Sequence, residues 1–264
     1  MYNFEYHKPT SVADAAALLA KADDAKLMAG GMTLLPTLKQ RLAQPSDVID
    51  LGGIAGLAGI RKEGNALVVG AMTTHAAVAH SAEVKATIPA LAHLAGMIGD
   101  PQVRHRGTIG GSIANNDPAA DYPGALVALG ATVTTNKRTI AADQFFTGLF
   151  ETALDAGEIV QSVSFPVPEK AAYTKFRNPA SRYAIVGSFV AKGPSGVRVA
   201  ITGAGPTVFR WKEAEAALAG SFTPAAVEKL TAPSSGLNSD IHASAEYRAH
   251  LVGVMTKRAV AAAG

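Results

Sequence analysis

The sequence predicts an α+β protein with two domains, one over residues 1–168 and a smaller one over 169–264. Segments with helical and strand-like patterns occur in both. Two Gly-Gly segments about eighty residues apart mark the first domain, which we divide into parts of about 1–55 and 56–168. The boundary is placed at Pro166-Val-Pro-Glu-Lys170, because two prolines close together break both helix and sheet.

The first part of the chain is expected to begin with a helix over 11–21, since capping residues precede an alanine-rich stretch. A short buried strand is expected at 26–29, followed by a turn at Gly30-Gly31. Thr33 is placed to cap a second helix over 34–42. This order of strand, glycine turn and helix is one that an anion-binding site requires.

The rest of the chain is expected to continue as a mixture of strands and helices. Glu63-Gly64-Asn65 predicts the turn of a hairpin between 57–61 and 66–72, and Gly130 is a candidate C-terminal cap. Further strands are expected at 45–51, 131–135, 158–165, 184–191 and 197–204, and helices from 74 and over 89–98, 123–129, 211–218, 224–230 and 244–262.

Composition narrows the class of protein. The chain has 264 residues, 48% of them hydrophobic, and its 24 Lys and Arg are scattered among 21 Asp and Glu, so no nucleic-acid partner is predicted. It has no cysteine, which excludes disulfides, thiolate zinc sites and cysteine-ligated iron–sulfur clusters within the chain itself. The start carries no leader pattern and no apolar run approaches the length of a membrane span, so a cytoplasmic protein without a membrane segment is expected.

The two Gly-Gly segments, residues 27–33 and 108–123, carry the main functional prediction. Glycine lacks a Cβ atom and lets backbone N–H groups approach an anion closely, as a pyrophosphate requires. One Gly-Gly pair alone is most simply a tight turn. Together they predict a flavin dinucleotide site, because the second segment also carries polar groups suited to ribose hydroxyls or a flavin edge: Asn115, Asn116, Asp117 and Asp121. Alternatively, Asp117 caps a helix that begins at Pro118.

Other groups of residues are weaker indicators of function. Gly203-Ala-Gly205 lacks the third glycine of a nicotinamide fingerprint and is interpreted as a structural turn. Arg104-His105-Arg106 is interpreted as a solvated basic segment, and neither a metal site nor a catalytic triad or carboxylate pair is predicted. The cluster of Lys175, Arg177, Arg182 and Tyr183 is either an exposed basic strand or part of a flavin site, with the tyrosine stacked on the ring.

Several motifs together point to a known family. They are Ala29-Gly-Gly-Met-Thr33, Thr108-Ile-Gly-Gly-Ser112, Asn116-Asp-Pro-Ala-Ala-Asp-Tyr-Pro123, Phe145-Phe-Thr-Gly148, Lys175 to Tyr183 and Ser244-Ala-Glu-Tyr-Arg248. With these motifs the chain resembles the medium, FAD-binding subunit of the molybdenum hydroxylases, most of all the aerobic carbon monoxide dehydrogenase type, which is related to the FAD domain of xanthine dehydrogenases. The resemblance implies a two-part FAD-binding domain of the vanillyl-alcohol-oxidase (PCMH) type and a small C-terminal α+β domain.

The resemblance also implies the residues that bind FAD. Both Gly-Gly segments would hold the pyrophosphate, mainly through backbone groups, which assigns Ala29, Gly30, Gly31, Met32, Thr33, Thr108, Ile109, Gly110, Gly111 and Ser112. Asp121 would lie near FAD, Val160 and Ile98 near the isoalloxazine, Lys175 near its polar edge and Tyr183 against its face. Met32 and Ser112 depart from the usual polar residue and asparagine, but neither change removes a backbone N–H donor.

The implied function is electron transfer inside a larger complex. A large subunit would carry the molybdenum cofactor, a small subunit would carry 2Fe–2S clusters, and FAD in this chain would pass electrons to an external acceptor, in a dimer of heterotrimers. The absence of cysteine agrees with this division. Two alternatives stay open: a self-contained FAD-dependent oxidoreductase with its own small substrate, and a non-catalytic assembly or nucleotide-sensing module.

Overall fold

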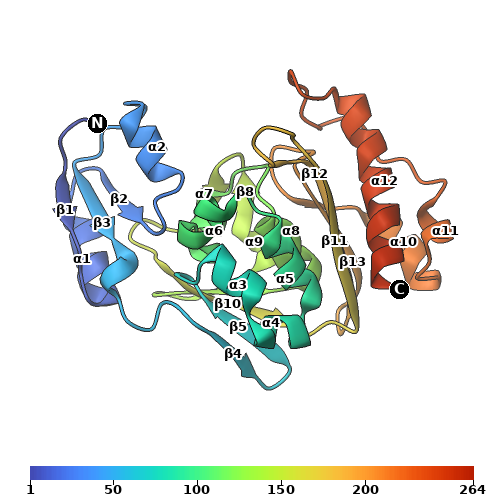
Figure 1. The fold of residues 1–264 in the computed structure, drawn as a ribbon, viewed down its shortest axis with the longest axis horizontal. Coiled ribbons are helices and arrows are strands. Elements are labelled where there is room, and N and C mark those ends of the chain that lie inside the picture. Colours follow the sequence, from blue (N-terminus) through green and yellow to red (C-terminus); the bar gives the residue numbers. More distant parts are fainter.

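The computed structural model describes residues 1–264, which form three units side by side along the long axis of the molecule (Figure 1). The N-terminal unit is a parallel sheet in the order β1-β3-β2, with α1 connecting β1 to β2. Its elements are β1 (Glu5–His7), α1 (Val12–Lys21), β2 (Ala25–Met28), α2 (Leu34–Lys39), β3 (Asp47–Asp50) and the 3-10 helix η1 (Leu51–Gly53).

The middle unit is an antiparallel sheet in the order β4-β5-β10-β6-β7 with short helices beside it and a small β8-β9 hairpin. Its strands are β4 (Ile60–Glu63), β5 (Ala66–Gly70), β6 (Thr132–Thr135), β7 (Thr139–Ala141), β8 (Phe146–Gly148), β9 (Glu151–Thr152) and β10 (Val160–Pro166). Its helices are α3 (His75–His80), α4 (Ala82–Thr87), α5 (Pro89–Gly96), α6 (Pro101–Arg106), α7 (Ile109–Asn115), α8 (Tyr122–Leu129) and α9 (Ala142–Phe145).

The C-terminal unit is an antiparallel sheet in the order β11-β12-β13-β14, against which α10 and α12 pack. Helices α5 and α8 of the middle unit pack against the same sheet, which therefore lies between the two groups of helices (Figure 1). Its elements are β11 (Lys170–Arg177), β12 (Ala184–Gly193), β13 (Gly196–Thr202), β14 (Phe209–Arg210), α10 (Lys212–Gly220), α11 (Pro224–Val227) and α12 (Ala245–Ala263).

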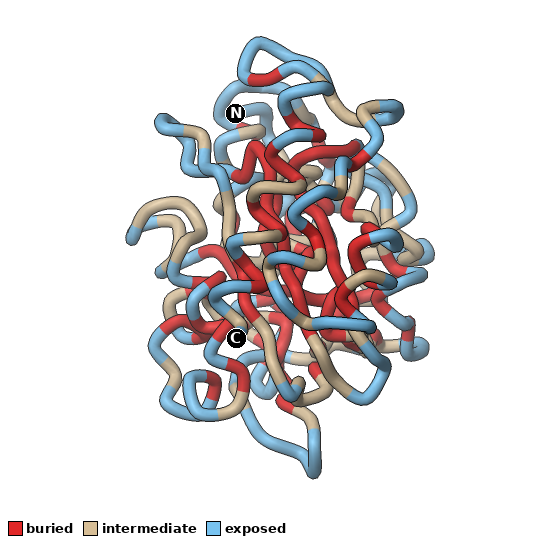
Figure 2. The backbone as a smooth tube through the Cα atoms, turned by 90° about the vertical axis from the view of Figure 1, so that its right-hand side faces the viewer, coloured by how far each residue is buried: buried red, intermediate tan, exposed pale blue.

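Strand β12 shows why the middle and C-terminal units share a core. Successive side chains of a strand point to opposite faces of the sheet. Phe189 and Ala191 accordingly pack into the core of the middle unit, whereas Val186 and Val190 pack under α12. Because both faces are covered, the first eight residues of β12 are all buried, and buried chain runs through the centre of the molecule (Figure 2).

The structure confirms most of the expected elements and corrects several. The second Gly-Gly segment, where no helix was expected, forms α7 over residues 109–115. The second helix ends at Lys39, before Arg41 adopts a left-handed φ of 59°, and the Thr33 hydroxyl makes no cap bond. No helix begins at Pro118, since Asp117 instead accepts a hydrogen bond from the Ala119 N–H in a tight turn.

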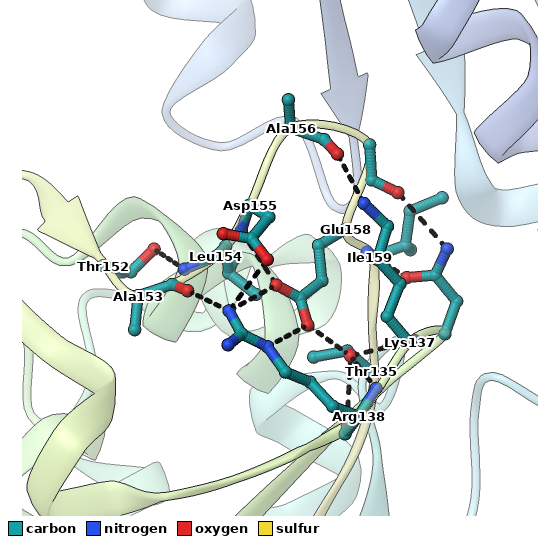
Figure 3. A network of polar contacts seen from close by, with 12 residues as sticks. Thr135, Lys137, Arg138, Thr152, Ala153, Leu154, Asp155, Ala156, Glu158 and Ile159 are labelled. Atoms are coloured by element: carbon teal, nitrogen blue, oxygen red, sulfur yellow. Dashed lines mark hydrogen bonds and ion pairs between the residues drawn. The ribbon is translucent and has the colours of Figure 1, made fainter.

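A polar network fixes the start of β10 in the middle unit (Figure 3). The buried Glu158 carboxylate accepts hydrogen bonds from the Thr135 hydroxyl at 2.6 Å, the Asp155 N–H at 2.8 Å and the Arg138 guanidinium at 3.1 Å. Asn136 accepts a further hydrogen bond from the Ile159 N–H at 2.7 Å. The network thus anchors the chain immediately before Val160.

We expect Glu158→Gln to lower the free energy of unfolding by about 2 kcal/mol at neutral pH, because the buried carboxylate loses its charge and its ion pair with Arg138. Solvent screening of the half-exposed Arg138 guanidinium keeps the loss from being larger. Hydrogen bonding from Arg138 lowers the pKa of Glu158 to about 2, so its stabilisation is present above pH 4.5 and is lost as the pH falls towards 2. Urea unfolding across this range should show a weaker acid dependence in the variant.

The exposed Arg61–Glu63 ion pair offers a matched control for that measurement. Glu63→Gln makes the same chemical change where both partners are solvated, and it should cost less than about 0.5 kcal/mol. If the two variants lost equal stability, the buried network would not be what anchors β10.

Candidate functional site

The fold brings the two Gly-Gly segments into direct contact. A Cβ atom on Gly30 would lie 1.9 Å from the Arg106 carbonyl oxygen, and one on Gly111 would lie 3.2 Å from the Ala29 Cβ. Gly31 has a φ of 74°, which suits glycine. The glycines therefore let the turn after β2 lie against the end of α6 and the start of α7, and we call this contact the glycine seam.

The turn after β2 presents an unusual row of backbone donors. None of the backbone N–H groups of residues 29–34 donates a hydrogen bond within the protein. Backbone N–H groups rarely remain unpaired in a folded protein unless water or a ligand accepts from them. Consecutive free donors on a glycine-containing turn fit an anion such as a pyrophosphate. This segment is therefore suited to the cofactor that the sequence predicts.

The second segment is organised differently. Ile109 and Gly110 donate to the carbonyls of Thr73 and Ala71, at 3.1 and 2.8 Å. Gly111 and Ser112 donate to the Thr108 hydroxyl and carbonyl, at 3.1 and 3.0 Å. These N–H groups are thus already paired, and the groups that this segment still offers to a ligand are the hydroxyls of Thr108 and Ser112.

A buried polar cluster lies between the start of α8 and β11. The Lys175 ammonium is 2.9 Å from one Asp121 oxygen and 3.1 Å from the other, and the Tyr173 hydroxyl donates to the same carboxylate. The side chains of Lys175 and Asp121 are only 1% and 4% exposed. Lys175 is therefore not part of an exposed basic strand, and that alternative is wrong for this residue.

Tyr183 lies on the turn between β11 and β12 with its side chain partly open to solvent. It is 46% exposed, so a planar ligand has a ring face to cover. Burial, followed by the charges of Asp117 and Asp121, raises its pKa. The turn is closed by the Asn178 N–H, which donates to the Tyr183 carbonyl at 2.8 Å.

The turn that carries Tyr183 is tied to the middle unit, and the strand that follows it is tied to α12. Arg182 donates to the Gly99 carbonyl at 3.3 Å, just after Ile98, which packs at the edge of the middle core. Buried Arg248 donates to the carbonyls of Ile185 and Gly203, at 2.7 and 2.9 Å. This gives a structural role to the Ser244–Arg248 motif, in which Ser244 caps α12.

Two further predicted residues, Val160 and Asn116, are both buried but differ in their contacts. Val160 is buried at a bulge at the start of β10, where its position is set by the Glu158 network. Asn116 is also buried, but its amide donates to the carbonyls of Gly148 and Glu151, at 2.8 and 2.7 Å. Asn116 thus holds the β8-β9 hairpin, and it is not an open ribose-binding group.

Helix α6 connects two parts of the predicted site. It runs from Pro101, close to the Ile98-Gly99 segment, to Arg106 at the glycine seam, and α7 begins at the seam. At 1.5 Å per residue α6 is about 9 Å long. Because Arg182 on the Tyr183 turn donates to the Gly99 carbonyl, that turn lies near one end of α6 and the seam lies at the other.

Sequence reasoning did not identify Tyr173 as part of this cluster. The signal that would have found it is the two-residue spacing from Lys175, which places both side chains on one face if the segment is a strand. A strand was considered only as one of two alternatives for the cluster that begins at Lys175, so Tyr173, which precedes that cluster, was not included. In the structure only three residues separate β10 from β11.

Comparison with known proteins identifies the family of the chain. Residues 2–168 match the family described as the FAD binding domain in molybdopterin dehydrogenase, and residues 171–263 match the CO dehydrogenase flavoprotein C-terminal domain. These matches define the class as flavin-binding subunits of molybdenum enzymes. The chain belongs to the FAD-binding medium subunits of the molybdenum hydroxylases.

Individual relatives cover nearly the whole chain. The carbon monoxide dehydrogenase medium chain of Hydrogenophaga pseudoflava is 39% identical over 98% of this chain and 96% of its own. The nicotine 6-hydroxylase medium subunit of Paenarthrobacter nicotinovorans is also 39% identical, with the same coverage. Among solved structures, carbon monoxide dehydrogenase from H. pseudoflava superposes with a TM-score of 0.90 at 40% identity, covering 99% of this chain and 97% of that one.

A more distant relative shows the same fold. Quinoline 2-oxidoreductase from Pseudomonas putida 86 has a TM-score of 0.89 at 30% identity, covering 99% of this chain and 96% of that one. The family membership and the α+β architecture predicted from the sequence are thereby confirmed. No helix has both the length and the apolar character that a membrane span requires.

Proposed function

We propose that this chain is the electron-transferring FAD subunit of a heteromeric molybdenum hydroxylase, and that FAD binds along the site from the glycine seam to the Asp121 cluster. The observation that carries the proposal is the row of free backbone N–H groups at residues 29–34, next to the seam. We place the division between an FAD-binding domain and a C-terminal domain near residue 168.

We assign the pyrophosphate to the first glycine turn. Its donors are the N–H groups of Ala29, Gly30, Gly31, Met32 and Thr33, supplemented by the hydroxyls of Thr108 and Ser112. Because backbone groups supply most of these donors, Met32 leaves the donor set intact. Ile109, Gly110 and Gly111 contribute by letting α7 pack under the turn, since their own N–H groups are paired inside the protein.

We assign the isoalloxazine to the other end of the site. Tyr183 would cover a face of the ring, Ile98 and Val160 would line it, and Asp121 with Lys175 would supply the charge beside it. When bound, FAD supplies a carrier that accepts electrons and passes them on. The chain's own residues orient the cofactor and set the local charge.

The partners proposed are those of the relatives' complexes. A large subunit would hold the molybdenum cofactor, and a small subunit would hold the 2Fe–2S clusters that deliver electrons to FAD. The chain has no cysteine with which to ligate such clusters itself. We further propose a cytoplasmic dimer of heterotrimers in which FAD passes electrons to an external acceptor.

Titration of the purified chain with FAD, followed by its visible spectrum and by equilibrium dialysis, tests the cofactor assignment. We expect one FAD per chain. Gly111→Trp should abolish binding, because a bulky side chain would start between the Thr108 hydroxyl and Ala29. Gly220→Ala should bind normally, since open space surrounds that position. A wild-type chain that binds no FAD, or a Gly111→Trp variant that binds it fully, would contradict the assignment.

A further inference from the structure

Tyr173, Lys175 and Asp121 form a closed set of polar side chains in the interior. Asp121 stands at the N-cap position of α8, yet its carboxylate accepts no hydrogen bond from that helix. It faces β11, where Tyr173 donates to the oxygen that lies 2.9 Å from the Lys175 ammonium. Asp121 therefore does not cap α8, and its carboxylate instead interacts with these two partners.

The residues around Tyr173 leave room for its hydroxyl and fix the position of its ring. Gly187 of β12 is paired with Lys175, and a Cβ atom there would lie 2.4 Å from the hydroxyl oxygen. The ring is buried and stacks on Phe189 with 6.0 Å between ring centroids. Glycine on one side and a stacked ring on the other hold the hydroxyl in the position from which it reaches Asp121.

The charge of Asp121 interacts with an exposed residue of the site. It contributes to the raised pKa of Tyr183, the exposed tyrosine on the neighbouring turn. Other titratable groups around Asp121 are Lys175 and Tyr173 on β11, Tyr122 on α8 and Asp117 before α8. Among these only Lys175 is a cation, and another cation at this end of the site, Arg182 on the Tyr183 turn, is exposed to solvent. The buried contribution to the field therefore depends on how far Asp121 offsets the Lys175 ammonium.

Burial raises the pKa of Asp121, whereas the Lys175 charge and the hydrogen bonds from Tyr173 and Lys175 oppose that rise. Removing the tyrosine hydroxyl therefore favours the protonated carboxyl. The Lys175 ammonium would then lose its counter-charge. Reduced FAD carries more negative charge than oxidised FAD, so an unopposed cation nearby favours the reduced form.

We propose that Tyr173 is a positioning residue that keeps the Asp121 carboxylate paired with Lys175 and so lowers the reduction potential of FAD bound in this chain. This inference rests on the proposed FAD site and adds to it a residue that sets the charge beside the flavin. Tyr173 acts through Asp121 and does not contact the cofactor in this account.

The test is the midpoint potential of FAD bound to the full-length chain, with dissociation constants for oxidised and reduced FAD. Tyr173→Phe should favour reduced over oxidised FAD about tenfold more than the wild type, a rise of about 30 mV for a two-electron couple. Thr174→Val is the matched control, because it removes a hydroxyl from the same strand that bonds the Met255 carbonyl. It should leave the potential unchanged.

A double-variant cycle separates positioning from packing. Asp121→Asn should raise the potential in the same direction, and Tyr173→Phe should add nothing in that background if the tyrosine acts through Asp121. An unchanged or lowered potential in FAD-bound Tyr173→Phe would overturn the inference and leave the proposed function standing. If Tyr173→Phe does not fold, an Asp121→Asn chain with wild-type potential would overturn it equally. A wild-type chain without FAD would instead overturn the proposed function.

Discussion

Gly30→Ala is expected to weaken FAD binding at least a hundredfold, equivalent to about 2.7 kcal/mol. Gly30 does not require a left-handed backbone, so the effect is purely steric. Its new Cβ would lie 1.9 Å from the Arg106 carbonyl oxygen and 2.9 Å from the Gly107 Cα. Backbone groups cannot move aside as the tip of a flexible side chain can. The turn must therefore move away from α6, and its row of N–H donors moves with it.

The measurement is equilibrium dialysis of FAD, paired with urea unfolding to show that the variant is folded. Overpacking at the seam should cost about 1 to 3 kcal/mol of unfolding free energy, which leaves most of the protein native. Gly220→Ala is the control: no atom lies within 4 Å of its added methyl group, and alanine favours a helix. Wild-type affinity in Gly30→Ala would show that the seam does not position the FAD-binding donors.

The sequence predicted the structure correctly at positions where a local pattern is compatible with only one backbone arrangement. The paired glycine segments predicted a joint cradle, and the structure does bring Gly30 and Gly111 to one seam. Gly130 was expected as a C-terminal cap and adopts the left-handed conformation at the end of α8. Such features follow from the absence of a Cβ atom, which can be recognised without knowing any distant neighbour.

The sequence was uninformative where a group's partner lies far along the chain. The N–H groups of Ile109 and Gly110 were expected to face a ligand, but they bond carbonyls at positions 73 and 71. Likewise, the exposure of Lys175 could not be judged without Asp121, which lies 54 residues away. Pairing across such separations is decided by how the sheets and helices pack, and no local spacing encodes it.

Lys175→Met tests the buried cluster most directly, and we expect it to lower the free energy of unfolding by about 3 to 5 kcal/mol at pH 7. Methionine has a similar length without the charge, so Asp121 would keep only the Tyr173 hydroxyl as a partner. Burial already raises the pKa of Asp121, and loss of the ammonium raises it further. The folded variant then binds a proton more tightly than the unfolded chain, whose aspartate pKa is about 3.9.

The sign of the pH effect follows from that difference. A carboxyl whose pKa is raised in the folded state loses stability as the pH rises from the unfolded value to the folded value. The penalty of Lys175→Met should therefore be smaller at pH 5 than at pH 7, as measured by urea unfolding of the FAD-free chain. Adding Asp121→Asn removes the unpaired charge and should restore much of the stability at pH 7. A penalty that is equal at both pH values, or that the second change does not relieve, would mean that Asp121 is not held as a carboxylate by Lys175.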